Sequence, residues 1–146
     1  MEGYISPLHD SYATFICSFP WDLYETVTFR RPRRDAYSAA RSLFTTLYSK
    51  FGAERMFVAV ERFSESRDIH LHALSRHTFE KEVYPERIWK YLFKKYGRTS
   101  VEVPRGAYGV SLYCSKYVTK SGTGDDFYFF GDKEAWNLDV RHYETA

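Results

Sequence analysis

The chain has 146 residues, two cysteines and a formal net charge of +2. This length suits one domain with one sizeable core, and two cysteines do not make a disulfide framework. No apolar run approaches the roughly 18 residues that a membrane span needs. We therefore expect a single cytoplasmic domain over residues 1–146, with a core at about 22–131 and no membrane partner. The mild positive charge permits nucleic-acid binding without requiring it.

The predicted elements alternate between strands and helices. Tyr24–Phe29 alternates and is rich in strand formers, and a helix capped by Asp35 and closed by Gly52 follows. A second helix begins at Pro85 and ends at Gly97. Further strands are predicted at residues 56–63, 68–76, 99–103 and 127–130. This order predicts an α+β fold, a central antiparallel β-sheet with helices on one face.

Each predicted helix has an apolar face that would pack on the sheet. In the first helix this face consists of Ala36, Ala39, Ala40, Leu43, Leu47 and Phe51. In the second it consists of Ile88, Trp89, Leu92, Phe93 and Tyr96.

A third helix is predicted after Gly106, and one of its faces is unusual. Spacing of i, i+3, i+4 and i+7 places two tyrosines and two lysines on that face, namely Tyr113, Lys116, Tyr117 and Lys120. Cys114 and Val118 belong to a separate apolar stripe that would seat the helix on the sheet. The polar face offers two nucleophiles and two ammonium groups, although alone it is also compatible with an ordinary solvated helix face.

A metal site is predicted on the strand that contains His70 and His72. Strand alternation points both imidazoles to one face and Leu71 to the other. If Phe63 pairs with Asp68 across the preceding hairpin, Glu61 lies directly opposite His70. Two imidazoles and one carboxylate suit Mn²⁺, Mg²⁺ bound through waters, or Zn²⁺. A His-x-His pair in a strand is also common without a metal, so the register decides the prediction.

Together these motifs resemble the HUH endonucleases. His70-Leu71-His72 is similar to the His-hydrophobe-His motif of that superfamily, and Glu61 occupies the place of its acidic third ligand. The segment from Tyr113 to Lys120 resembles the Tyr-x-x-Lys motif in its doubled form, as in rolling-circle replication initiators of small phages, viruses and plasmids. The resemblance covers residues from about 22 to 121.

The resemblance implies a ferredoxin- or RRM-like fold, with the tyrosine helix near the sheet face opposite the other helices. It also implies metal-dependent nicking and joining of single-stranded DNA through a 5′-phosphotyrosine intermediate. Tyr113 would be the first nucleophile, Tyr117 a second, and Lys116 and Lys120 would supply charge. The substrate would be a replication origin, as a hairpin, with a host helicase and polymerase as partners. Because the chain is too short to include a helicase, we expect a minimal initiator or an excised nuclease domain.

Basic residues after the first strand are candidates for DNA contacts. They are Arg30, Arg31, Arg33 and Arg34. Trp21, Tyr24 and Trp89 are candidates for base stacking, although Trp89 also fits the core.

Two alternatives stay open at this point. One is a small single-tyrosine transposase of the same superfamily, although such enzymes usually place a glutamine after the tyrosine where this chain has lysine. The other is a non-catalytic module resembling an RNA-recognition domain.

Overall fold

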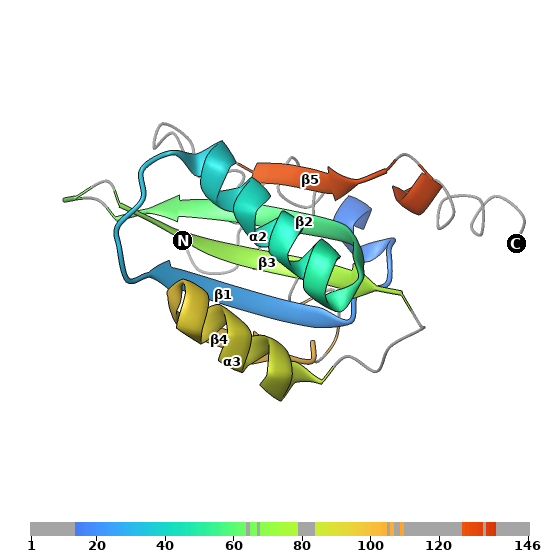
Figure 1. The fold of residues 1–146 in the computed structure, drawn as a ribbon. Helices are drawn as coiled ribbons and strands as arrows, with labels where there is room; N and C mark the ends of the chain where they lie inside the picture. The colour runs from blue at the N-terminus through green and yellow to red at the C-terminus, as the bar shows by residue number, and fades with distance from the viewer. Residues whose placement is uncertain are drawn as a thin grey trace, which may run out of the picture.

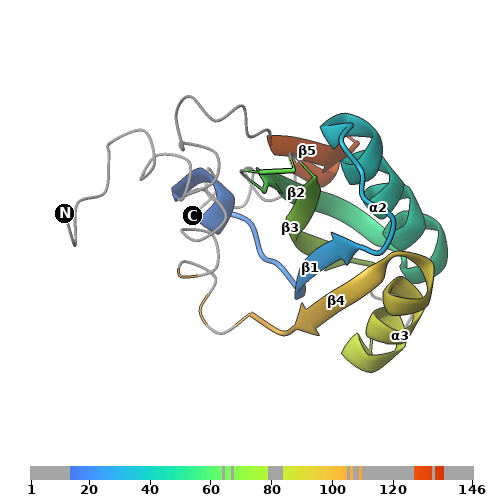
Figure 2. The same cartoon turned by 90° about the vertical axis from the view of Figure 1, so that its left-hand side faces the viewer.

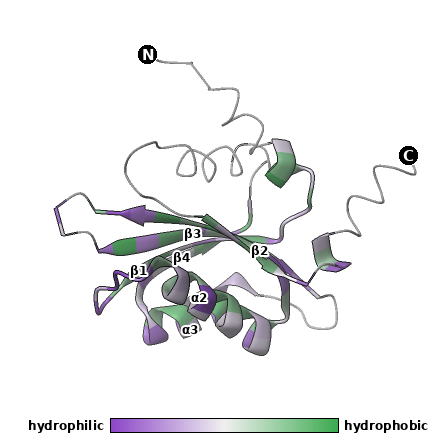
Figure 3. Cartoon of the chain, turned by 90° about the horizontal axis from the view of Figure 1, so that it is seen from above, coloured by the Kyte–Doolittle hydropathy of each residue, from purple (hydrophilic) through white to green (hydrophobic). Residues whose placement is uncertain are grey.

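The computed structural model describes residues 14–63, 65–66, 68–78, 84–104, 106, 109, 127–132 and 134–136. Within these ranges the chain forms a five-stranded antiparallel sheet with two longer helices on one face (Figures 1 and 3), which confirms the predicted α+β class. The strands are β1 (Leu23–Phe29), β2 (Ala53–Arg62), β3 (Ile69–His77), β4 (Gly97–Glu102) and β5 (Phe127–Gly131). The helices are α2 (Ala36–Phe51) and α3 (Pro85–Lys95).

The strand order in the sheet is β4-β1-β3-β2-β5. The strands at the two ends of α2, β1 and β2, are separated by β3, and the strands at the two ends of α3, β3 and β4, are separated by β1. Two β-α-β units therefore interleave, as in a split β-α-β arrangement. Figure 2 shows the sheet with both helices against the same side. The last predicted strand, β5, pairs with β2 at the edge of the sheet.

Both predicted caps of α2 are confirmed. The side chain of Asp35 accepts a hydrogen bond from the Ser38 backbone N–H at 2.8 Å. Gly52 closes the helix with a left-handed backbone, φ 70°. A Cβ at this position would also lie 2.7 Å from the Thr78 hydroxyl, so a larger residue would be strained and crowded.

The prediction for α3 was wrong at two positions. Ile88 and Leu92 are buried, but Trp89 and Phe93 are 40% and 45% exposed. The buried residues continue at Tyr96, and this i, i+4, i+8 row is a narrow stripe. Since α3 packs mainly on β4, at the edge of the sheet, little of the described chain is placed to cover a wider apolar face. The two exposed rings stack on each other instead, with centroids 5.2 Å apart.

The sheet separates two apolar clusters. The larger lies between the sheet and the helices and includes Val27, Leu43, Val58, Leu71 and Leu92. The smaller lies on the opposite face and consists of Ile16, Phe19, Trp21, Phe57, Ala59 and Leu74. Trp21 is thus a core residue rather than a base-stacking one, at 9% exposed.

Arg55 is buried at the border of the smaller cluster. Its guanidinium donates hydrogen bonds to the carbonyl oxygens of Pro20 and Ala135. The same group lies over the rings of Trp21 and Trp136, at 4.8 and 5.5 Å from their centroids. Aromatic faces and carbonyl oxygens together compensate a cation in this apolar setting.

Candidate metal centre

The β2–β3 hairpin has the predicted register. Glu61 pairs with His70, and the Phe63 N–H donates to the Asp68 carbonyl oxygen at 2.8 Å. Val58 and Val60 contribute to the core under the helices, which leaves Glu61 on the other face with the histidines. A short hairpin and an apolar inner face were sufficient to fix this register from the sequence.

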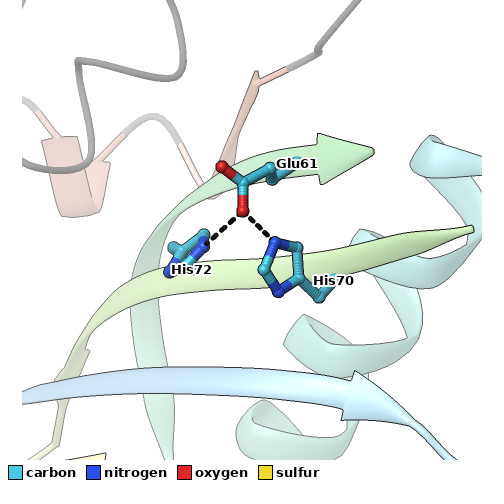
Figure 4. A group of neighbouring side chains, drawn as sticks. All are labelled: Glu61, His70 and His72. Carbon is cyan, nitrogen blue, oxygen red and sulfur yellow. Dashed lines mark hydrogen bonds and ion pairs between the residues drawn. The ribbon is translucent and has the colours of Figure 1, made fainter. Parts of the chain in front are cut away.

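Three potential ligands converge on this face (Figure 4). The nearest ligand atoms of Glu61, His70 and His72 all lie within 4.8 Å of one another. Glu61 Oε1 contacts His70 Nε2 directly and lies 3.7 Å from His72 Nε2. The side chains are 21%, 17% and 6% exposed, respectively. Glu61 and His70 are therefore partly exposed on this face, and His72 is buried.

Tyr24 on β1 contacts the most buried of the three ligands. Its hydroxyl lies 3.1 Å from Nδ1 of His72, and the two rings are nearly parallel, with an interplanar angle of 14°. Because this hydrogen bond occupies Nδ1, Nε2 is the nitrogen directed at Glu61. An outer hydrogen bond of this kind fixes the orientation of a metal-bound imidazole. Tyr24 was considered a base-stacking residue in the sequence, and its contact with His72 was not foreseen.

Polar side chains continue the open face toward the sheet edge. In the β1–β3 register Thr26 pairs with His72 and Thr28 pairs with His70. The Thr26 hydroxyl is hydrogen-bonded to that of Ser100 on β4. The candidate metal ligands therefore lie at one end of a row of hydroxyl groups that crosses two further strands.

The donor set fits a divalent cation. One carboxylate oxygen and two imidazole nitrogens are three protein ligands, which leave coordination positions for water or substrate. A metal–ligand distance of about 2.0–2.2 Å requires neighbouring donors roughly 3–3.5 Å apart, close to the separation between Glu61 and His72. An ion would replace the direct contact between Glu61 and His70. These residues could thus hold a metal, whose identity the donor set alone does not fix.

The basic residues after β1 lie at the same end of the sheet as this centre but have separate contacts. Arg30 donates to the Phe93 carbonyl oxygen at 3.0 Å, near the end of α3. Arg33 lies over the Phe29 ring at 5.2 Å. Arg34 is highly exposed and forms an ion pair with Asp68 at 3.5 Å. Arg31 is exposed.

The tyrosine helix lies outside the described residues. This applies to Tyr113, Lys116, Tyr117 and Lys120, and to the packing stripe predicted for Cys114 and Val118. Their roles stay predictions.

A second acid–histidine cluster, not foreseen from the sequence, is buried on the helix side of the sheet. Glu25 is fully buried and its Oε1 is hydrogen-bonded to the Ser75 hydroxyl. Ser75 Oγ also lies 2.8 Å from His77 Nε2, and His77 Nδ1 donates to the Phe51 carbonyl oxygen at 2.8 Å. His77 therefore bonds the last residue of α2 and is buried.

Burial sets the protonation of this cluster. Desolvation raises the pKa of Glu25 to about 8, although the Ser75 hydrogen bond opposes the rise. Desolvation also lowers the pKa of His77. The raised pKa of Glu25 and the lowered pKa of His77 both favour the uncharged form of the group at neutral pH. The second carboxyl oxygen, Glu25 Oε2, is buried without a hydrogen-bond partner among the described residues.

No helix among the described residues is long and apolar enough to span a membrane. Comparison with models of known families, with curated proteins and with solved structures finds no match for this chain. The resemblance to HUH endonucleases consequently rests on the motifs, to which the structure adds an antiparallel sheet and a Glu-His-His group that could bind a metal.

Proposed function

We propose that this protein is a metal-dependent endonuclease that nicks and rejoins single-stranded DNA, as rolling-circle replication initiators do. The convergence of Glu61, His70 and His72 on the open face of the sheet supports this proposal most directly. Such a half-buried N₂O site with open positions is suited to a phosphate oxygen as a further ligand. The doubled Tyr-x-x-Lys motif supplies the nucleophile that the metal group lacks.

The proposed reaction is a transesterification. The Tyr113 oxygen attacks the scissile phosphorus and loses its proton, the bond from phosphorus to the 3′-oxygen breaks, and that oxygen leaves as a 3′-hydroxyl after protonation. The 5′-phosphate stays on the tyrosine. A bound Mn²⁺ or Mg²⁺ would polarise the phosphate and stabilise the charge that develops on it. Lys116 adds positive charge, while Tyr117 and Lys120 provide a second set for strand transfer.

The substrate is proposed to be an exposed strand at a replication origin, presented in a hairpin. Rows of hydroxyls on β1 and β4, such as Thr26 and Ser100, provide hydrogen-bond donors beside the metal ligands. Donors of this kind position the backbone without reading bases. A host helicase and polymerase would extend the released 3′ end.

A covalent-adduct experiment tests the proposal. The protein is incubated with a pool of single-stranded hairpin oligonucleotides and Mn²⁺, and denaturant-resistant protein–DNA adducts are measured on a gel. We expect adducts with the wild type, none after chelation, and none with Glu61→Gln. The exposed Tyr48 offers a matched control, since Tyr48→Phe removes a hydroxyl far from the metal ligands.

Variants at the two candidate nucleophiles identify the attacking residue. Tyr113→Phe should abolish the first adduct, and Tyr117→Phe should reduce strand transfer more than nicking. Adduct formation by Tyr113→Phe at the wild-type rate would contradict the assignment of Tyr113. Metal binding without any adduct would leave a non-catalytic nucleic-acid-binding module.

A further inference from the structure

A pocket of about 450 Å³ lies on the helix side of the sheet, between the segment after β1, the middle of α2 at Ser42 and the end of α3. Its lining includes Phe29, Arg30, Arg31, Arg33, Lys95 and Tyr96. Because Phe29 ends β1 and Thr28 pairs with His70, the pocket is at the metal end of the strands but on the opposite face.

The charged side chains that line this pocket among the described residues are all positive. Three guanidinium groups and one ammonium group line it, and no carboxylate among the described residues does so. Like charges held this close repel one another unless an anion or solvent compensates them. The pocket is distinct from the ion pair of Arg34 with Asp68, which lies outside it.

Arg33 provides the most specific observation. Its guanidinium lies over the Phe29 ring, 5.2 Å from the centroid, and its Nη1 atom is buried with no hydrogen-bond partner among the described residues. A buried donor without a partner is costly, more so when it is charged. The geometry thus leaves the Nη1 group of Arg33 without an acceptor among the described residues, on a guanidinium held over the Phe29 ring.

The walls of the pocket are held rigidly. Arg30 donates to the carbonyl oxygens of Phe93 and Lys94, so the end of α3 already compensates this guanidinium. The Tyr96 hydroxyl is hydrogen-bonded to Ser42 at 2.7 Å and to Thr46 at 2.9 Å, which ties the end of α3 to α2. Arg30 is therefore a wall residue, and Arg31, Arg33 and Lys95 are the groups available to a ligand.

We propose that this pocket binds a phosphate oxyanion, with Arg33 as the principal ligand and Arg31 and Lys95 as supporting charges. A planar guanidinium fork matches the spacing of phosphate oxygens. The phosphate can belong to the backbone of a DNA strand that passes round the end of β1 from the metal centre, or to a free phosphate compound. Only the first source rests on the proposed function.

The first measurement uses inorganic phosphate as the probe. Its affinity for the metal-free protein is determined by calorimetric titration at constant ionic strength. We expect Arg33→Gln to weaken phosphate binding by about tenfold or more, as the loss of one charge-assisted hydrogen bond implies. Arg33→Lys keeps the positive charge but loses the planar guanidinium. Its phosphate affinity should lie between those of Arg33→Gln and the wild type. Lys50→Gln makes the same charge change about 12 Å away along α2 from Ser42 and should leave the affinity unchanged.

The second measurement distinguishes the two sources. Single-stranded DNA affinity is measured against salt concentration, where each lost phosphate contact flattens the logarithmic slope by about 0.7. A flatter slope in Arg33→Gln assigns the pocket to the DNA backbone, and an unchanged slope beside weakened phosphate binding assigns it to a free phosphate compound. If Arg33→Gln binds phosphate as Lys50→Gln does, the proposal is overturned. Loss of covalent adducts alone would contradict the nuclease and not this pocket.

Discussion

The two faces of the sheet each contain a cluster of glutamate and histidine, and β3 contributes to both. Under the helices, Glu25 is joined through Ser75 to His77, and an internal carbonyl oxygen completes the chain. On the open face, Glu61 meets His70 and His72, and the ligand atoms converge on one another.

Burial and the type of partner account for the difference between the clusters. The inner group is enclosed and has a hydrogen-bonding arrangement that needs no ion. The outer group is partly exposed, and its three ligand atoms point at a common centre. Similar residue types thus form an uncharged hydrogen-bonded group when buried and a candidate ion site when partly exposed.

The largest expected effect is on the open face. Replacing both histidines, His70→Ala together with His72→Ala, should eliminate stoichiometric Mn²⁺ binding in a calorimetric titration, because only one protein ligand stays. The free energy of unfolding in the absence of metal should change far less. Glu86→Gln, an exposed change on α3, serves as the control. Unchanged Mn²⁺ binding by the double variant would show that His70 and His72 do not hold the metal.

A pH experiment tests the inner cluster. The pKa of Glu25 rises from 4.5 in the unfolded chain to about 8 in the fold. Between these values only the folded state keeps the proton, so the Glu25 contribution to stability is fully present below pH 4.5 and is lost as pH rises to 8. Over that window the loss is on the order of 5 kcal/mol.

The variant Glu25→Gln removes this titration. Its free energy of unfolding, measured in urea at pH 5 and pH 8.5, should improve relative to wild type as pH rises. The lowered pKa of His77 makes the free energy of unfolding rise with pH below the usual histidine pKa. Because this contribution is present in both proteins, it cancels when the variant is compared with the wild type. A difference between variant and wild type that does not change with pH would show that Glu25 is charged in the fold.

A smaller effect is expected at the hydroxyl that orients His72. Tyr24→Phe should weaken Mn²⁺ binding by roughly 10–100-fold, the range for loss of an outer partner of a metal ligand. The imidazole signals of His72 in nitrogen NMR should also show a changed tautomer, which a purely structural role would not produce. Tyr37→Phe, at an exposed tyrosine of α2, is the matched control. Equal metal affinity in both variants would exclude a positioning role for Tyr24.

The smallest effect concerns the helices that seal the inner cluster. Asp35→Ala removes the side chain that accepts from Ser38 and should lower the free energy of unfolding by about 1 kcal/mol. Mn²⁺ affinity of the folded protein should be unchanged, because α2 lies across the sheet from the ligands. Thermal unfolding together with metal titration checks both expectations. A parallel loss of metal affinity would show that the two faces are coupled.

The parts of this molecule that could be predicted are those fixed by local rules. The cross-strand pairing of Glu61 with His70 could be predicted because a short hairpin sets the register. The helix caps at Asp35 and Gly52 could be predicted from their residue types. The contact of Tyr24 with His72 depends on pairing two strands 48 residues apart, and no turn sets that register.

The inner cluster escaped prediction for a different reason. Glu25 lies between the buried residues Leu23 and Val27, at a position where alternation indicates an apolar side chain. Its partner His77 lies one residue beyond the predicted end of the strand. Burial of a carboxyl group can be explained only when its hydrogen-bond partners are known, and here they belong to separate strands.

The hydrogen bonds and aromatic rings around Arg55 have a consequence for folding during synthesis. The larger core uses buried residues between Leu23 and Tyr96, so it can form when that part of the chain has left the ribosome. The Arg55 guanidinium bonds the carbonyl oxygens of Pro20 and Ala135 and also lies over the Trp136 ring, so this cluster can be completed only after residue 136 has been synthesised. A nascent chain that stalls before residue 127 would therefore display an unfinished apolar surface beside the candidate metal ligands, a form that chaperones and proteases recognise.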